Sequence, residues 1–375
     1  MFMEKKKLLV VCTTDSMIWN FLQEHILYWE EKGINVECAC SKTGFYFDEL
    51  QRKGFDLTEI SFERSPFKIK NIKAYKQLNQ LVERRKYDLI VCQEPVGGAI
   101  SRLVAKRNDV PCIYTAHGFH FFKGAPLINW LIFYPIENLL SRNTKTLIVL
   151  NNEDYKIAKK MHANHVEKLN GIGINTTKIN SSNVDIDTKK KELNLQLDKK
   201  IFLNVAELIK RKNHETAIRA FYKADLEDSI YIICGDGQLE ENLKSLVREL
   251  KIEDKIIFLG FRKDVAEIYK ISDFFLFPSY QEGLSISLLD AIAAGIPVIV
   301  SNIRGNVDIV SPKINGLIYD ANDVNGFAEG LRLIRKMDDR KIMDFNMKLI
   351  EKYDIDVVKK HFFKIIADVL KRGEN

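Results

Sequence analysis

The sequence predicts an α/β protein built from two doubly wound domains. Short apolar runs such as KLLVVCT, INVECAC and DLIVCQE alternate with longer helical patterns in the first half of the chain. The same rhythm returns in the second half with IFLNVAE, SIYIICGDG and GIPVIVS. Strands that alternate with helices imply βαβ crossovers and a parallel sheet, and two such series in 375 residues imply two cores of ordinary size.

A polar stretch after Gly171 marks the expected boundary between the domains. It is rich in Asn, Lys and Asp and nearly free of aromatic residues, which is typical of a linker. We expect an N-terminal domain over residues 1–175 and a C-terminal domain over residues 176–354. The amphipathic segment at about 355–375 could fold back on the first domain or pack on the second.

The composition indicates a soluble globular protein. Hydrophobic residues make up 46% of the chain and charged residues 29%, and the net charge is +6. The six cysteines are scattered among strand-like runs with no CxxC pair, as expected of buried thiols in a reducing cytoplasm. The first apolar run is shorter than the core of a signal peptide and predicts the first strand.

The stretch SYQEGLSISLLDAIAAGIPVI in the second domain predicts a phosphate site. A strand ends just before it, and a helix is expected from about Leu284, where free N–H groups suit an anion. Gly283 permits a close backbone approach to a phosphate oxygen, and Ser285 adds a hydroxyl. Glu282, before the helix, would then face the other end of the ligand.

The two acids of this stretch, Glu282 and Asp290, fit a glycosidase poorly. The two carboxyl groups of a glycosidase lie about 5 to 9.5 Å apart, whereas eight residues along a helix cover about 12 Å. The spacing favours separate contacts to hydroxyl groups of one long ligand. The alternative is that Glu282 caps the helix and Asp290 faces solvent.

Cations cluster at the first strand-to-helix turn of the second domain. In VAELIKRKNH, Lys210, Arg211 and Lys212 follow a strand, where they would neutralise a diphosphate and stabilise it as a leaving group. A solvated basic turn is the alternative.

Two glycine-bearing turns follow later strands of this domain. CGDG contains Gly235 and Gly237, and GFRKD contains Arg262; both turns are expected on the rim of the binding cleft. No complete dinucleotide fingerprint or P-loop occurs in the chain, which argues against NAD or ATP chemistry.

A histidine follows a strand of the first domain, in the stretch YTAHGFHFFKG. His117 is expected to face the cleft and contact the reacting group, with a packed histidine as the alternative. His117 and His120 lack an acid or cysteine at ligand spacing, so a metal is not expected there. Two D-x-D triplets, at 185–187 and 354–356, follow no buried strand and do not predict a metal site either.

A basic amphipathic helix is expected over residues 64–86. This run carries eight basic residues against one acid, with apolar residues interleaved, and it suits an anionic membrane surface. The candidate membrane contacts are Lys68, Lys70, Lys73 and Lys76. The apolar segment 126–140 is too short to span a bilayer, and both core packing and membrane insertion remain open for it. No nucleic-acid-binding module accompanies the basic helix, so no nucleic-acid partner is expected.

Taken together, these stretches resemble glycosyltransferase family 4, whose members have the two-domain GT-B fold and retain the anomeric configuration of the donor. The resemblance covers nearly the whole chain. It is strongest in EGLSISLLDAIAAGIPVI, which is similar to the family motif E-x7-E with an aspartate as the second acid. It implies two Rossmann-like domains that face each other across a cleft.

The resemblance assigns the residues of this motif to the donor. It implies that Glu282 contacts hydroxyls of the donor sugar and that Asp290 contacts the ribose. The amides near Gly283, Leu284 and Ser285 would bind the diphosphate.

The resemblance also implies roles for residues in two other motifs. The family pattern G-R-L-x-x-x-K-G stands here as AELIKRKN, so Lys212 keeps a diphosphate role and Arg211 substitutes for the arginine that Glu207 replaces. His117, in TAHG, matches the family histidine near the donor sugar and the acceptor.

The stretches SNIRGNVDIV and NGLI are similar to the bacterial capsule and exopolysaccharide branch of the family. The function implied is a retaining hexosyltransferase that moves a hexose or N-acetylhexosamine from a nucleotide-diphosphate sugar, UDP-linked, to a saccharide on a polyprenyl diphosphate in capsule, exopolysaccharide or O-antigen synthesis. It would need no cofactor and would lie in the cytoplasm, peripheral to the inner leaflet of the plasma membrane. The alternatives are a nucleotide-sugar 2-epimerase of the same fold and a non-catalytic sugar-nucleotide sensor.

Overall fold

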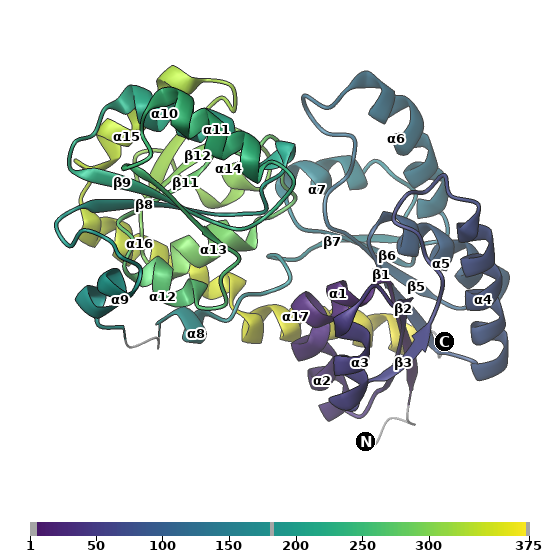
Figure 1. Ribbon diagram of the computed structural model, residues 1–375. Helices are drawn as coiled ribbons and strands as arrows, with labels where there is room; N and C mark the ends of the chain where they lie inside the picture. Colours follow the sequence, from purple (N-terminus) through teal and green to yellow (C-terminus); the bar gives the residue numbers. More distant parts are fainter. Residues whose placement is uncertain (1–5, 181–183, 373–375) are drawn as a thin grey trace. The chain divides into compact units, whose positions relative to one another are not determined.

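The computed structural model describes residues 6–180 and 184–372, which form two α/β units (Figure 1). The first unit contains Met1–Gly173 together with Ile355–Asn375, and the second contains Ile174–Asp354. Each unit has one parallel sheet with helices on both faces. The predicted α/β class with two doubly wound sheets is therefore confirmed.

The sheet of the first unit has the strand order β3-β2-β1-β4-β5-β6-β7. Because helices cover both faces, the strands are continuous apolar runs, and the first strand is fully buried from Leu8 to Cys12. The order of the strands reverses between β1 and β4. The strands are β1 (Lys7–Thr14), β2 (Asn35–Ser41), β3 (Asp56–Glu59), β4 (Leu89–Gln93), β5 (Cys112–Ala116), β6 (Thr146–Val149) and β7 (His165–Lys168).

The helices of the first unit form two layers. The helices α4, α5 and α6 cover one face of the sheet, and α2 and the C-terminal helix α17 pack together on the other. Phe362 of α17 meets the ring of Trp29 of α2 with their centroids 5.1 Å apart. The helices are α1 (Asp15–Met17), the π-helical turn η1 (Ile18–Leu22), α2 (Gln23–Glu31), α3 (Phe45–Arg52), α4 (Lys70–Arg85), α5 (Pro95–Arg107), α6 (Leu127–Ser141), α7 (Asn152–Ala158) and α17 (Ile355–Arg372).

The sheet of the second unit has the order β10-β9-β8-β11-β12-β13 and reverses between β8 and β11. Figure 1 shows α10, α11 and α15 over one face and α12, α13 and α16 over the other. The strands are β8 (Lys200–Val205), β9 (Ser229–Cys234), β10 (Ile256–Gly260), β11 (Phe274–Phe277), β12 (Val298–Ser301) and β13 (Gly316–Tyr319). The helices are α8 (Thr176–Asn180), α9 (Ile186–Glu192), the 3-10 turn η2 (Lys210–Lys212), α10 (His214–Ala224), α11 (Glu240–Leu250), α12 (Val265–Lys270), α13 (Ile286–Ala293), α14 (Asn306–Ile309), α15 (Val324–Ile334), α16 (Asp339–Ile350) and the 3-10 turn η3 (Glu351–Tyr353).

The polar stretch after Gly171 is not the linker that its composition predicts. It contains α8 and α9, and its few apolar residues are buried in the core of the second unit: Ile174, Ile179, Leu193 and Leu195. Asp185, in one of the D-x-D triplets, caps α9 by accepting a hydrogen bond from the backbone N–H of Thr188 at 2.7 Å. The chain passes from the first unit to the second between Gly173 and Ile174, at the start of this stretch. The rest of the stretch is folded although it is polar, because two short helices need few apolar residues to dock on a larger core; residues 181–183 lie outside the described chain.

The two segments considered for a membrane both contain helices, and the basic helix is shorter than predicted. The basic helix begins at Lys70 rather than near residue 64, and residues 64–67, which include Pro66, form a bend and a turn before it. Helix α6 is apolar on two sides: Trp130 packs on the core of the first unit, whereas Leu127 and Leu131 are 81% and 72% exposed. Over residues 6–180 and 184–372, no helix combines the length and the apolar character needed to cross a bilayer.

Candidate functional site

Each sheet gathers loops at the point where its strand order reverses. In open α/β sheets, ligands bind outside the carboxyl ends of the two strands on either side of this reversal. Those strands are β1 and β4 in the first unit, and β8 and β11 in the second. The loops that follow β8 and β11 carry most of the residues that the sequence predicts for ligand binding.

A compact charged cluster lies beyond β8 and β11. Glu282 Oε1 accepts a hydrogen bond from Lys212 Nζ at 2.8 Å and another from Arg211 Nη1 at 3.0 Å. The side chains of Glu282 and Lys212 are only 8% and 12% exposed, whereas that of Arg211 is 42% exposed. Two motifs about 70 residues apart in sequence therefore meet in a cluster with two cations for one carboxylate, a balance that suits an anionic ligand.

Asn213 holds the cationic turn against the neighbouring loop. Its backbone is left-handed, with φ 57°, and its side-chain Nδ2 donates to the carbonyls of Pro278 at 2.9 Å and Ala321 at 2.7 Å. Asparagine is among the few non-glycine residues that adopt this conformation readily. It can therefore stand where the family pattern has glycine, and its side chain adds two hydrogen bonds.

The loop before α13 ends at a serine that caps the helix. The helix is capped by Ser285, whose Oγ accepts a hydrogen bond from the N–H of Leu288 at 3.4 Å, so Glu282 is not the cap. Gly283 and Leu284 precede this cap. A helix N-terminus of this kind suits an anion.

Arg304 and Gly305 support this backbone, and the sequence-based prediction did not select them as site residues. Arg304 is 4% exposed and its Nε donates to the carbonyl of Glu282 at 3.2 Å. Gly305 has φ 80°, and a Cβ there would lie 2.5 Å from the carbonyl oxygen of Gly283. The Arg-Gly pair after β12 is visible in the sequence, but its role depends on contacts with residues 282 and 283, which are distant in sequence.

Asp290 lines a cavity of about 250 Å³ beside Lys178, Lys263 and Tyr269. It is half-buried and does not simply face solvent. Burial raises the pKa of Asp290 to about 7, and the charge of Lys178 opposes this shift. The cavity therefore presents a carboxyl group that titrates near neutral pH beside two lysines.

Gly235 and Gly237 bring the turn after β9 against the loop after β8. Gly235 has φ 143°, and a Cβ there would lie 2.0 Å from the carbonyl oxygen of Ala206. Gly237 has φ 155°, and a Cβ there would lie 2.6 Å from the carbonyl oxygen of Leu208. Both glycines are therefore required for the backbone to pack, whether or not a ligand is bound.

Arg262, predicted to contact the ligand, is engaged in an ion-pair network. Its guanidinium binds both carboxylate oxygens of Asp264, at 2.8 and 2.6 Å. Lys189 also binds this carboxylate, at 2.6 Å. Arg262 is the largest cause that holds the pKa of Asp264 well below its usual range.

His117 follows β5 in the first unit and pairs with Gln93 at the end of β4. The distance from His117 Nε2 to Gln93 Oε1 is 2.8 Å, so Nε2 donates when this amide orientation holds and Nδ1 is then an acceptor. Burial lowers the pKa of His117 to about 4, which makes it neutral at physiological pH. His120 instead packs on Phe133 with ring centroids 4.8 Å apart. Within the described chain, no group of three or more His, Cys, Asp and Glu residues could hold a metal ion.

Glu94 occupies the reversal point of the first sheet and was not predicted. Its carboxylate accepts a hydrogen bond from the backbone N–H of Thr13 at 2.9 Å, across β4 and β1. Its backbone has φ 64°, and burial raises the pKa of its carboxyl group. Nearby Asp15 is fully buried and accepts backbone hydrogen bonds from Ser16 and Phe47, so it fastens the loop after β1.

Two family models match the chain. Residues 7–152 match the model described as "Glycosyl transferase 4-like", and residues 185–352 match "Glycosyl transferases group 1". The chain is 32% identical over 333 residues to the putative glycosyltransferase EpsD of Bacillus subtilis, with 86% of each chain covered. It is 31% identical over 330 residues to the Escherichia coli UDP-Gal:alpha-D-GlcNAc-diphosphoundecaprenol alpha-1,3-galactosyltransferase, covering 85% of this chain and 84% of the relative.

Solved structures share the arrangement of the fold. A glycosyltransferase from Rickettsia africae ESF-5 superposes with a TM-score of 0.81 at 18% identity, covering 98% of this chain and all of the other. At this identity the likeness concerns the fold alone, and the fold is GT-B.

Proposed function

The chain belongs to the glycosyltransferases described by the group 1 and 4-like models, and from this premise we propose that it moves a hexose or N-acetylhexosamine from a UDP-linked sugar to a saccharide on a polyprenyl diphosphate. Its similarity to the E. coli galactosyltransferase, whose name contains both a UDP sugar and a diphosphoundecaprenol-linked acceptor, supports this pair of substrates. Capsule, exopolysaccharide or O-antigen synthesis is the corresponding proposal for its pathway.

The observation that carries the proposal is the Glu282–Lys212–Arg211 cluster beside the start of α13. The amides near Gly283, Leu284 and Ser285 would bind the donor diphosphate, and Lys212 and Arg211 would stabilise the charge that develops as it leaves. Glu282 would accept hydrogen bonds from hydroxyls of the donor sugar. Since the protein supplies the cations, the proposal uses no metal ion and no cofactor.

The reaction needs no protein nucleophile. The acceptor oxygen forms a bond to the anomeric carbon as the bond from that carbon to the diphosphate oxygen breaks, and the acceptor proton passes to the departing phosphate. Attack on the face that the diphosphate leaves retains the anomeric configuration. Neutral His117 would hydrogen-bond the donor sugar or the acceptor, and the protein would act by positioning and by charge stabilisation.

We propose that the cavity that contains Asp290 binds the nucleoside end of the donor. Lys263, in the loop after β10, lines the same cavity. Asp290 would accept a hydrogen bond from a ribose hydroxyl. An ionised carboxylate accepts better than a protonated one, so this contact is expected to strengthen as the pH rises through about 7.

We also propose that the protein is cytoplasmic and associates with the inner leaflet of the plasma membrane. Lys68, Lys70, Lys73 and Lys76 are all exposed, on α4 and just before it. The neighbouring apolar residues Phe67, Ile69 and Ile72 are 73%, 82% and 58% exposed, respectively. Cations interleaved with exposed apolar side chains suit an anionic bilayer surface.

The proposed function is tested with a panel of UDP- and GDP-sugars and a polyprenyl-diphosphate saccharide. We expect transfer from one UDP-sugar, detected as a larger lipid-linked saccharide. Conversion of UDP-GlcNAc without an acceptor, visible by NMR, would instead identify a 2-epimerase. Donor binding with neither product would identify a sensor, and either result would overturn the proposal.

A further inference from the structure

The first unit contains a mainly apolar cavity of about 530 Å³ that the proposed chemistry does not use. Its volume lies within the range of about 300 to 1,000 Å³ typical of small-molecule sites. Its apolar lining comes from the segment before α4, from α5, from the loop after β5 and from α6, and includes Phe67, Ile100, Phe121, Phe133 and Ile136. Polar side chains also line the cavity, but the larger share of its lining is apolar, which suits a hydrocarbon better than a saccharide.

One part of the cavity lining belongs to the reversal point of the first sheet. Thr13, Glu94 and Gly118 line it there, and Gly118 directly follows His117. Arg64 lines the cavity as well and is exposed, and its charge acts on Glu94. The cavity therefore joins apolar walls to the place where the acceptor is expected to react.

Other lining residues belong to an exposed apolar surface. Phe67 is 73% exposed and Ile136 is 47% exposed. On α6 the neighbouring Leu127, Leu131 and Leu139 are 81%, 72% and 61% exposed. A chain held in the cavity could continue over this apolar surface, which would cover one side of its hydrocarbon.

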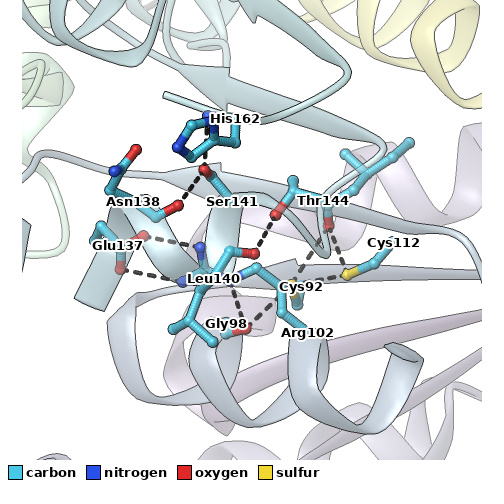
Figure 2. A network of polar contacts seen from close by, with 11 residues as sticks. Cys92, Gly98, Arg102, Cys112, Glu137, Asn138, Leu140, Ser141, Thr144 and His162 are labelled. Carbon is cyan, nitrogen blue, oxygen red and sulfur yellow. Dashed lines mark hydrogen bonds and ion pairs between the residues drawn. The ribbon is translucent and has the colours of Figure 1, made fainter. Parts of the chain in front are cut away.

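A buried ion pair fixes the wall that α6 provides (Figure 2). Arg102 of α5 is fully buried and binds both carboxylate oxygens of Glu137 of α6, at 2.8 and 3.1 Å. Its Nε donates to the carbonyl of Gly98. Its guanidinium also stacks over Tyr114 at 4.0 Å from the ring centroid. Because α6 is apolar on two sides, this polar pair decides which side faces inward. The side that carries the exposed leucines is thereby kept outward.

We propose that this cavity holds the part of a polyprenyl chain that adjoins the diphosphate of the acceptor. The inference rests on the proposed function for the class of acceptor and adds the place where its lipid binds. The hydrocarbon lies against α5 and α6, the saccharide lies towards His117, and the remainder of the chain passes over the exposed face of α6 into the membrane.

The test measures binding of inorganic diphosphate and of dimethylallyl, geranyl and farnesyl diphosphates by calorimetry, below their micelle concentrations and without membranes. For the wild-type protein we expect the Kd to fall by about tenfold for each added isoprene unit until the cavity is full. Ala99 lines the cavity on α5, and Ala99→Phe should remove this dependence on chain length while leaving the Kd of inorganic diphosphate unchanged.

Two variants serve as controls, and the thermal melt of each variant verifies its folding. Leu103→Phe lies on the same helix at a 45% exposed position that does not line the cavity, and it should keep the dependence on chain length. Leu131→Glu alters only the outer face of α6 and should also keep the dependence of the Kd on chain length. Equal Kd values for diphosphate and farnesyl diphosphate in the wild type would overturn the inference, as would a dependence that survives Ala99→Phe or disappears with Leu131→Glu.

A transfer assay separates this inference from the proposed function. With a short, lipid-free acceptor, the wild-type protein should still transfer sugar, because the hydrocarbon contributes to binding of the acceptor and takes no part in the chemical step. If transfer occurs but chain length has no effect on binding, the cavity assignment fails and the function stands. If chain length matters but no donor is ever transferred, the proposed function fails.

Discussion

The reversal points of the two sheets have the same topology and opposite chemistry. Beyond β8 and β11, Lys212 and Arg211 surround the one carboxylate of Glu282. Beyond β1, β4 and β5, the groups that line the site include a histidine whose burial lowers its pKa to about 4 and a glutamate whose burial raises its pKa, while Asp15 is occupied by backbone hydrogen bonds. The same strand order therefore presents a cationic site in one unit and a weakly charged, largely apolar site in the other. The topology determines where a ligand binds, and the loop sequences determine which ligand it is.

The largest expected effect comes from removing a cation in the second unit. Lys212→Ala should lower kcat/KM by about 100- to 1,000-fold, because a partly buried cation at the proposed leaving-group site acts mainly in the transition state. Steady-state transfer assays would measure this change. Lys210→Ala is the control, since Lys210 is an exposed residue of the same turn. Near-normal turnover of a folded Lys212→Ala variant would remove the basis for the charged site.

The next effect concerns the proposed membrane-binding surface of the first unit. Reversing Lys68, Lys70, Lys73 and Lys76 to glutamate should weaken binding to anionic liposomes by at least about 100-fold, since each lysine near such a surface contributes about 1 kcal/mol. Sedimentation with liposomes would measure it. The control reverses four exposed lysines of the second unit: Lys191, Lys251, Lys336 and Lys348. Equal losses of liposome binding for the two sets of variants would mean that the two units do not differ in how they bind an anionic membrane.

A smaller effect concerns the pH dependence of stability through Asp290. Its pKa of about 7 in the folded state lies above the ordinary value of 3.8, so the native state keeps a proton that the unfolded state has released. The free energy of unfolding should therefore fall as the pH rises through this window and level off above 7. Asp290→Asn should be more stable than the wild type at pH 8 by on the order of 2–4 kcal/mol, with a smaller difference at pH 5.

Urea titrations at both pH values test this prediction. Asp344→Asn, at an exposed position on α16, should show no such change between pH 5 and 8. A stability difference for Asp290→Asn that does not vary with pH would contradict the raised pKa.

The smallest expected effect tests whether the His117 side chain of the first unit is neutral near physiological pH. Wild-type His117 should stay neutral across pH 6–8 and contribute no inflection to kcat/KM in that range. Gln93→Glu places a carboxylate beside its Nε2, which should raise the pKa of His117 and change kcat/KM by no more than about tenfold between pH 6 and 8. NMR of the His117 ring protons would follow the titration. Gln93→Leu is the uncharged control, and a wild-type ring that titrates near 6.5 would contradict the prediction.

Much of the fold and part of the site could be predicted from local patterns. Buried parallel strands are continuous apolar runs, so their alternation with helices identified the class. The carboxyl ends of parallel strands share one edge, which is why two distant motifs could be expected to bring Glu282 and Lys212 together. The helix α13 begins close to the predicted residue because Ser285 caps it.

The remaining features depend on contacts between distant residues. Arg304 and Gly305 matter because they lie against the backbone of residues 282 and 283, which no local pattern indicates. Glu94 is placed by the neighbouring strand β1. The two-sided apolar pattern of α6 left its orientation open, since the answer depends on Arg102 of another helix.

The exposed leucines of α6 also determine how the protein behaves in a purification. In buffer without lipid, an apolar face of this kind has only another protein molecule to cover it. We therefore expect reversible self-association that increases with protein concentration and is relieved by mild detergent or by lipid nanodiscs. The helix that we propose faces a bilayer would then be the main cause of self-association in solution, and Leu131→Glu is the first change to make when preparing concentrated samples.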